Sequence, residues 1–188
     1  RLFFFLPFRV MTSAQSPDLR LGAWALARRS HSPKHGDIVL FRLPSPRGRT
    51  PGALHLGRIV ALPGDSIELR AGRLVVNEEE VHDYRHEINP SESYALRLPR
   101  EGGVYPITST NLVAYRSALL EEQKLYPSAP DEVALEGTDP KHWLKALAKN
   151  PYHTFRRDYY WVLTDQTQAA PDSRHLGILP ADAILGIV

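Results

Sequence analysis

Short apolar runs that end at prolines or glycines are the feature that most constrains the fold of this chain. Its sixteen prolines and twelve glycines are scattered along all 188 residues. Between them lie runs rich in valine, isoleucine, leucine and aromatic side chains, among them residues 37–43, 56–62 and 159–163. Short runs between turn residues are typical of β-strands, because helices need longer periodic segments. The sequence therefore predicts a mainly β protein with antiparallel strands.

A hairpin is expected near the middle of the first half. Ala71 and Gly72 separate residues 67–70 from residues 73–77, and both flanking runs have strand character. A two-residue connection with glycine between two such runs is typical of a β-hairpin. We also expect a last strand over residues 184–188.

Two segments carry helical signals. Residues 111–123 place apolar side chains at helical spacing, and Ser109 or Thr110 can cap the start. A second helix is expected over residues 140–149, because proline suits the first helical position and the Asn-Pro pair at residues 150–151 ends it.

The sequence pattern changes after about residue 82, where polar residues begin to dominate. We therefore predict that two outer portions, residues 1–77 and 157–188, form one β-rich core. Residues 78–156 should form an inserted, partly helical subdomain that resembles a cap. The apolar side chains of its second helix are expected in a core; they are Trp143, Leu144 and Leu147.

Composition excludes several classes of protein. The chain has no cysteine, so disulfides and thiolate metal sites are excluded. Its net charge is only +2, and no basic and aromatic array indicates a nucleic-acid partner. No stretch reaches the roughly 18 consecutive apolar residues of a membrane-spanning helix. We expect no cofactor.

Histidine pairs offer the best case for a metal site, and it is weak. His31 and His35 lie four residues apart, as do His82 and His86. That spacing joins two ligands only on a helix, but Pro33 lies inside the first pair and the second pair falls in a predicted strand or loop. We therefore predict surface histidines and no metal.

The first ten residues, Arg-Leu-Phe-Phe-Phe-Leu-Pro-Phe-Arg-Val, allow two interpretations. One is a buried or edge strand. The other is the stub that follows a membrane anchor and lies at the membrane interface, since phenylalanines with flanking arginines suit that interface.

Several stretches resemble, in order, the motifs of bacterial signal peptidase I, a membrane-bound Ser-Lys endopeptidase family. They are residues 1–13, 35–41, 58–65, 73–77, and 172–174 with Gly177 and Pro180. The run Arg-Ile-Val-Ala-Leu-Pro-Gly-Asp, for example, is similar to the family's Lys-Arg-x-Val-Gly-Leu-Pro-Gly-Asp box. The large insertion also resembles that of Bacteroidetes-type members. The resemblance implies a signal-peptidase-like antiparallel β core.

The resemblance also implies where catalytic residues should stand. The family uses a serine nucleophile and a lysine that burial keeps neutral, so that it accepts the serine proton. Pro17 and Leu19 set the register of the nucleophile loop and place Ala14 at the serine position. Gly57 stands at the lysine position, and Ala170 stands where a second serine orients that lysine. None of the three can perform its role.

Other positions of the predicted site keep functional groups. By resemblance, Thr12 falls where a hydroxyl of the oxyanion hole is expected. Asp165, Asp172, Ser173 and Arg174 are expected to be structural, and Arg174 should pair with a carboxylate, with Asp172 as a candidate.

Three coordinated losses favour a natural pseudoenzyme. We expect a non-catalytic partner or regulator in secretory-protein processing that still binds extended peptides by strand addition. Its partners would be an active signal peptidase or secretory preproteins. It would be anchored to the membrane through an N-terminal segment absent from this sequence, on the extracytoplasmic (periplasmic) face.

Two alternatives remain at this point. One is an active serine endopeptidase that cleaves signal peptides with relocated groups, using Ser13 or Ser16 with His55 or His175. The other is a purely structural module whose inserted region binds proteins.

Overall fold

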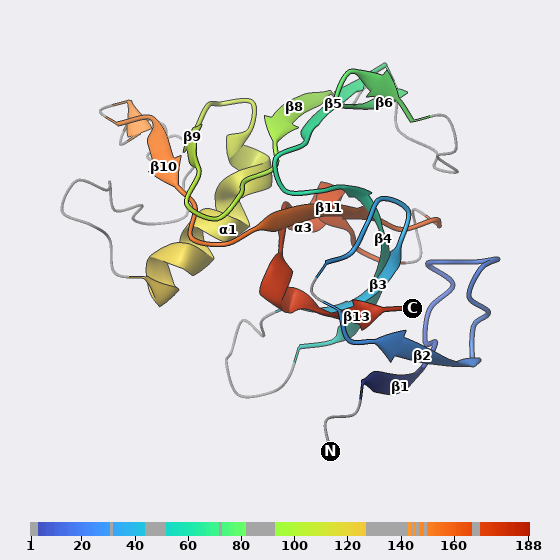
Figure 1. The fold of residues 1–188 in the computed structure, drawn as a ribbon. Coiled ribbons are helices and arrows are strands. Elements are labelled where there is room, and N and C mark those ends of the chain that lie inside the picture. The colour runs from blue at the N-terminus through green and yellow to red at the C-terminus, as the bar shows by residue number, and fades with distance from the viewer. Residues whose placement is uncertain are drawn as a thin grey trace.

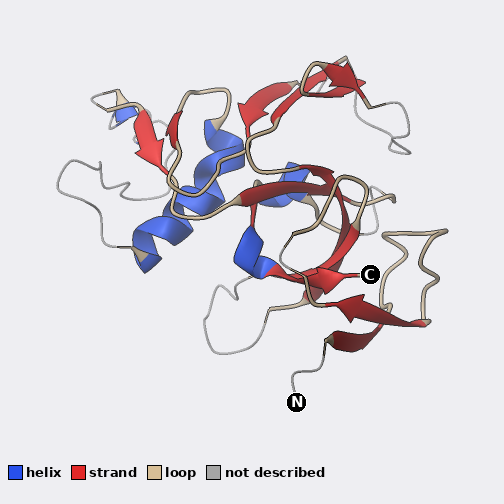
Figure 2. Ribbon diagram, viewed as in Figure 1, coloured by secondary structure: helices blue, strands red, loops and turns tan. Residues whose placement is uncertain are grey.

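The computed structural model describes residues 4–30, 32–43, 52–71, 73–81, 93–126, 143, 145, 147–148, 150–166 and 170–188. Within these ranges it has thirteen strands in three antiparallel sheets. The helices include α1 (Leu112–Leu125), the short α3 (Ser173–Leu176) and a 3₁₀ turn at Ala181–Ala183, and Trp143, Lys145 and Leu147 are also helical. The predicted mainly β, antiparallel fold is confirmed, and Figure 2 shows strands throughout the molecule with the long helix to one side.

The largest sheet joins both ends of the chain. Its strand order is β1-β2-β13-β3-β4-β11-β12. The bounds are β1 (Phe5–Arg9), β2 (Trp24–Arg28), β13 (Ile184–Ile187), β3 (Ile38–Arg42), β4 (Leu54–Ala61), β11 (Tyr159–Leu163) and β12 (Leu179–Pro180). The last strand, β13, therefore lies between strands from the first quarter of the sequence (Figure 1). The strands predicted at residues 37–43, 56–62, 159–163 and 184–188 are confirmed as β3, β4, β11 and β13.

The second sheet has the order β7-β6-β5-β8. Its strands are β5 (Ser66–Arg70), β6 (Arg73–Val76), β7 (Glu79–Glu80) and β8 (Tyr94–Arg97). The predicted hairpin is confirmed as β5–β6, and Ala71 turns the chain with a positive φ of 47°. Pairing between β5 and β8 runs across the predicted boundary at residue 77, and the division into core and subdomain stays a prediction.

A pair of short strands, β9 (Val104–Pro106) and β10 (Tyr152–Thr154), forms the third sheet beside helix α1. The helix predicted over residues 111–123 is confirmed as α1. The predicted caps, Ser109 and Thr110, were wrong. Asn111 stands at the N-cap without a side-chain cap bond, and its amide oxygen instead accepts a hydrogen bond of 2.8 Å from the Thr108 backbone N–H.

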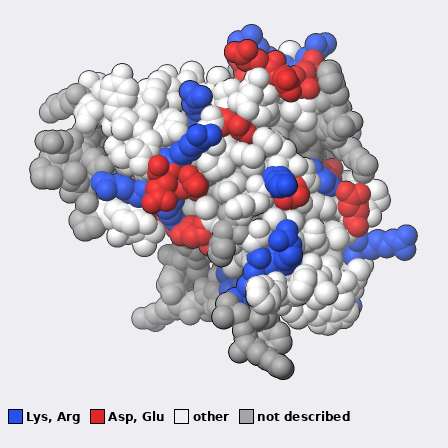
Figure 3. All heavy atoms as spheres, in the orientation of Figure 1, with Lys and Arg blue, Asp and Glu red and all other residues white. Residues whose placement is uncertain are grey.

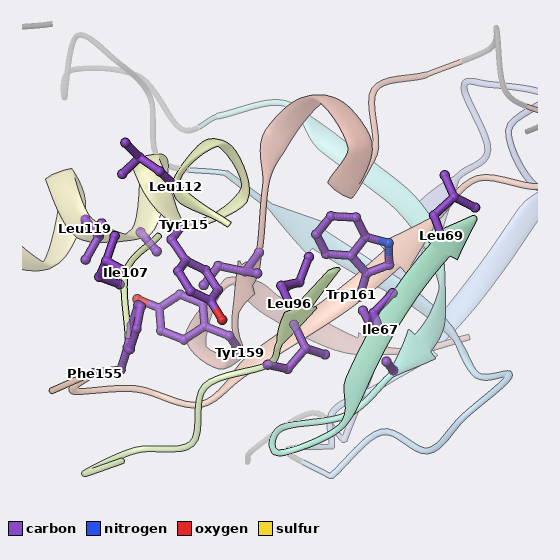
Figure 4. Close-up of a cluster of buried hydrophobic side chains, with 14 of the residues drawn as sticks. Ile67, Leu69, Leu96, Ile107, Leu112, Tyr115, Leu119, Phe155, Tyr159 and Trp161 are labelled. Atoms are coloured by element: carbon purple, nitrogen blue, oxygen red, sulfur yellow. The ribbon is translucent and has the colours of Figure 1, made fainter. Parts of the chain in front are cut away.

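The main hydrophobic core lies between the two larger sheets and α1. Figure 4 shows side chains of α1, such as Tyr115, next to Phe155 and Tyr159, while Trp161 lies beside Ile67 of the second sheet. Two residues of the predicted second helix belong to this core, because Trp143 and Leu147 are 0% and 6% exposed. Leu144 and most of residues 140–149 lie outside the described residues.

A buried carboxylate fastens α1 to the core. Glu122 is 2% exposed. Its oxygens accept hydrogen bonds from the Tyr159 hydroxyl at 2.8 Å and from the Arg156 backbone N–H at 3.0 and 3.1 Å. The His153 ring lies 3.2 Å away. Among the described residues, no helix is long and apolar enough to cross a membrane.

Candidate functional site

The predicted nucleophile loop, residues 12–19, is hydrogen-bonded to the C-terminal end of β11 and the residues that follow it. The Gln166 backbone N–H donates to the Ala14 carbonyl at 3.0 Å. The Gln15 side-chain amide donates to the Leu163 carbonyl at 3.4 Å. These bonds hold Ala14 with no exposed surface at all.

Gly57 lies in the middle of β4, where it pairs with Val39 of β3. A β-carbon added at Gly57 would lie 3.2 Å from Cε1 of Phe41 and 3.3 Å from Cβ of Val162. It would also lie 3.6 Å from the Leu163 carbonyl oxygen. The nucleophile loop and Gly57 thus meet the same carbonyl group of β11. The assignment of Ala14, Gly57 and Ala170 as degenerate catalytic positions stays a prediction.

Lysine side chains in the described part of the chain all lie at the surface. Lys34, Lys124 and Lys145 are exposed. Lys34 precedes β3, Lys124 lies in the last turn of α1, and neither element carries Ala14 or Gly57. A lysine base needs burial to stay neutral. None of these three lies in such a setting.

The two serines of the loop have no imidazole partner in the described structure. Ser13 is exposed, and the hydroxyl of Ser16 makes no hydrogen bond with a histidine. His55 instead stacks on Phe41 with ring centroids 5.4 Å apart, and burial lowers its pKa. His175 lies 3.6 Å from an Asp172 oxygen. Neither histidine is placed as a general base for these serines.

Thr12 turns its hydroxyl oxygen toward its own loop. Oγ1 accepts a hydrogen bond of 3.0 Å from the Ala14 backbone N–H. An oxyanion hole is built from donors that are free to reach a developing negative charge. The Ala14 N–H already donates to Thr12 Oγ1, so it is not free to bind a developing oxyanion. The assignment of Thr12 to an oxyanion hole stays a prediction.

Arg58 connects three segments at the predicted site. Its guanidinium grips Asp165 through two hydrogen bonds of 2.6 and 3.1 Å, and Asp165 is only 7% exposed. The same guanidinium bonds Asp18 of the nucleophile loop at 2.6 Å and the Gly36 carbonyl at 2.9 Å. The pairing with Asp165 is the main cause that raises the pKa of Arg58, and burial opposes it. Arg58 therefore clamps the loop onto β4 and the end of β11.

Asp18 and Gln15 were missed as site residues. The resemblance offered a signal for both, because the family's Ser-Met-x-Pro-Thr-Leu run has methionine where Gln15 stands and threonine where Asp18 stands. Both positions therefore differ from the family's run on either side of Ser16 and Pro17.

Asp172 organises the last part of the site. It is 1% exposed and accepts hydrogen bonds from Arg174 at 2.5 and 3.0 Å, and from the backbone and hydroxyl of Thr164 at 3.1 and 3.2 Å. Burial raises the pKa of Asp172, but the bonds from Arg174 and Thr164 outweigh it, so the pKa is lowered. The predicted pairing of Arg174 with Asp172 is confirmed.

Ser173 joins this loop to β11. Its hydroxyl oxygen accepts the Val162 backbone N–H at 2.9 Å, and the side chain is 1% exposed. Asp172 also caps α3 by accepting the Arg174 backbone N–H at 3.1 Å. Together these bonds hold the segment after Ala170 tightly against the strand that carries Leu163.

A hollow of about 520 Å³ is lined in part by Arg58. Its lining comes from the loop before β3, from β4 and from the β6–β7 turn; the residues are His35, Gly36, Arg58, Ile59, Val60, Val76, Asn77, Glu79, Glu80 and Val81. Ala14, Gly57 and Ala170 do not line it. His35 is held there by Asp65 at 2.8 Å.

Charges of both signs alternate on the surface that Figure 3 shows, including over the second sheet at its top. There Arg70 lies 2.5 Å from Glu68 and Arg73 lies 3.6 Å from Glu80. Within the described ranges no group of three or more His, Cys, Asp or Glu side chains could hold a metal ion. His31, His82 and His86 lie outside those ranges.

Comparison with known proteins places these features in context. The family described as signal peptidase, peptidase S26, matches residues 1–188. The chain is 22% identical over 220 residues to the signal peptidase I of Buchnera aphidicola subsp. Baizongia pistaciae (strain Bp), covering 100% of this chain and 69% of that protein. A crystal structure of a signal peptidase I from Enterococcus faecalis V583 has a TM-score of 0.39 and 21% identity, covering 84% of this chain and 97% of that one.

Proposed function

The chain belongs to the signal peptidase family, peptidase S26, and from that premise we propose that it is a non-catalytic member. Its role is that of a partner or regulator in secretory-protein processing, acting on an active signal peptidase or on secretory preproteins. This places it on the extracytoplasmic (periplasmic) face of the membrane.

The observation that carries the proposal is the chemistry at Ala14, whose neighbour Gln15 bonds the Leu163 carbonyl, and at Gly57, which lies beside the same carbonyl. Ala14 offers a fully buried methyl group, and Gly57 offers no side chain. Neither can attack a carbonyl or accept a proton. Loss of either member of a nucleophile–base pair typically lowers kcat by about a millionfold. The exposed lysines and the serines without an imidazole partner provide no substitute among the described residues.

Peptide binding does not need those groups. An extended peptide adds to a sheet through backbone hydrogen bonds. Within the described chain, β1 pairs only with β2, so its other edge is open to such a strand. The loop that holds Ala14 follows β1 directly. The proposed substrate contact is therefore an extended preprotein segment laid along this edge.

The outer face of β1 and β2 supports a place at the membrane. Phe5, Trp24 and Leu26 are 52%, 76% and 59% exposed on that face. Phe5 lies opposite Arg28, and Trp24 lies opposite Arg9. Aromatic and aliphatic side chains interleaved with arginines suit the interface between lipid headgroups and acyl chains.

The test measures cleavage and regulation in one assay. A purified preprotein is incubated in lipid vesicles with this chain alone, with an active signal peptidase I alone, and with both. We expect no cleavage by this chain and a changed kcat/KM of the active enzyme when both are present. The control is the same mixture with serum albumin in place of this chain.

Two results would contradict the proposal. Turnover by this chain alone, abolished by Ser13→Ala or Ser16→Ala, would establish the alternative of an active endopeptidase with relocated groups. An unchanged kcat/KM together with no binding to preprotein or enzyme would leave only a structural module.

A further inference from the structure

Gln15 is an unusual residue for the inside of a protein. Its side chain has 0% exposure. Nε2 donates to the Leu163 carbonyl at 3.4 Å, and Oε1 has no hydrogen-bond partner among the described residues. A buried polar atom without a partner lowers stability, and an apolar side chain of similar size would avoid that loss. Packing alone therefore does not explain a glutamine here.

The amide of Gln15 and the β-carbon position of Gly57 share one neighbour, the Leu163 carbonyl oxygen. The Leu163 carbonyl oxygen is 3.4 Å from Gln15 Nε2 and 3.6 Å from the β-carbon position of Gly57. Gln15 Nε2 and this β-carbon position can be no further apart than the sum of those two distances. A lysine carries its ammonium on a four-carbon stem, which is long enough to reach the amide.

The walls of this space leave the stem little freedom. The β-carbon itself would lie 3.2 Å from Phe41 and 3.3 Å from Val162, which is tighter than ordinary contact. A longer side chain at residue 57 therefore starts in close contact with both of these apolar groups. The Leu163 carbonyl oxygen lies 3.6 Å from the same β-carbon position and already accepts a hydrogen bond from Gln15.

The loop cannot move Gln15 aside without breaking other bonds. The Gln166 N–H holds the Ala14 carbonyl at 3.0 Å, on one side of Gln15. Arg58 holds Asp18 at 2.6 Å, on the other side, and is itself fixed by Asp165. Gln15 is thus held in place from both directions along the chain.

We infer that Gln15 is a plug that fills the vacated base position. Its neutral amide supplies the hydrogen-bond donor to the Leu163 carbonyl and closes the space against a lysine. Gln15 is a positioning residue, and the inference rests on the proposed function only in taking residue 57 as the base position. Restoring a serine at residue 14 and a lysine at residue 57 does not reopen the centre while Gln15 remains.

The test is a double-mutant cycle read by unfolding, which does not depend on activity. The variants of the full chain are Gly57→Lys, Gln15→Ala and the double variant, and the measurement is the urea unfolding midpoint. Gly57→Lys should lower the midpoint in the native background. In the Gln15→Ala background the same change should lower it by no more than half as much, because the plug is gone.

The matched control is Gly57→Ala in both backgrounds. Its β-carbon meets Phe41 and Val162 but stops short of the amide, so its effect on the midpoint should be the same with and without Gln15. Should Gly57→Lys fail to fold in the native background, Gly57→Met replaces it in the same cycle. Equal midpoint losses for the long side chain in both backgrounds would overturn the plug, whereas cleavage by the native chain would overturn only the proposed function.

Discussion

Two buried polar side chains, Asp172 and Gln15, lie at the end of β11 and differ in how completely they are hydrogen-bonded. Every oxygen of Asp172 accepts hydrogen bonds, from Arg174 and Thr164. Gln15 makes one long bond to Leu163 and leaves its own oxygen without a partner among the described residues. The hydrogen bonds of Asp172 therefore stabilise its segment, whereas the loop around Gln15 buries a polar atom that has no partner among the described residues. The two segments meet the same strand but differ in how completely their buried polar atoms are hydrogen-bonded.

The largest expected effect on the free energy of unfolding comes from removing the carboxylate of Asp172. Asp172→Ala leaves the guanidinium of Arg174, which is only 10% exposed, without its carboxylate. Breaking a buried pair by removing one partner costs about 3–5 kcal/mol. We expect a loss of unfolding free energy of that size in urea. Asp182→Ala is the control, because its carboxylate is 64% exposed where it pairs with Arg157, and a loss as large there would erase the contrast.

Acid should act on the same carboxylate. The folded-state pKa of Asp172 is lowered from 3.8. Its contribution to stability is therefore complete above pH 3.8 and is lost as the pH falls through the folded-state pKa. Unfolding midpoints measured from pH 6 down to about pH 2 should fall less steeply for Asp172→Asn than for the native chain. Parallel curves would mean that Asp172 contributes nothing to the acid sensitivity.

The unsatisfied member should respond in the opposite direction. Gln15→Met removes an amide whose oxygen has no partner among the described residues and keeps a long unbranched side chain. We expect the free energy of unfolding to rise by about 1 kcal/mol, because the penalty of the buried oxygen disappears. The measurement is again urea unfolding. Gln15→Glu is the matched comparison, and it should destabilise the chain by burying a carboxyl group. A net loss for Gln15→Met would mean that the Leu163 bond outweighs the free oxygen.

The smallest expected effect is on activity. Ala14→Ser restores only the hydroxyl, and a serine without a base stays protonated near neutral pH. We expect no cleavage of a preprotein above the background of the native chain. Detectable turnover by this single variant would show that another group of the chain acts as the base.

The strands were largely predictable because their cause is local. Short apolar runs between turn residues located β3, β4, β11 and β13 to within about two residues. The Ala-Gly pair located the hairpin at residues 71–72. The caps of α1 were not predictable, because the side chains of Thr108 and Asn111 bond each other's backbone N–H groups rather than those of the first helical turn. All four residues from 108 to 111 are types that cap helices, and only backbone geometry decides between them.

The candidate site was also predictable only in part. Motif order and spacing predicted the Arg174 pairing, which is confirmed, whereas the assignment of Ala14, Gly57 and Ala170 as degenerate catalytic positions stays a prediction. They could not reveal that Asp18 bonds Arg58, which lies 40 residues further along the chain. That bond depends on the nucleophile loop and β4 meeting at the end of β11.

By itself the sequence determined the family, the strand-rich fold and the identities of the side chains that stand at the predicted catalytic positions. These follow from composition, short-range pattern and motif spacing. Only the tertiary structure decided the strand order, with β13 between β2 and β3, and the burial of Gln15 against Leu163. Those features arise from contacts between segments more than a hundred residues apart. Local pattern specifies that a strand or a loop forms, but not which distant segment satisfies its hydrogen bonds.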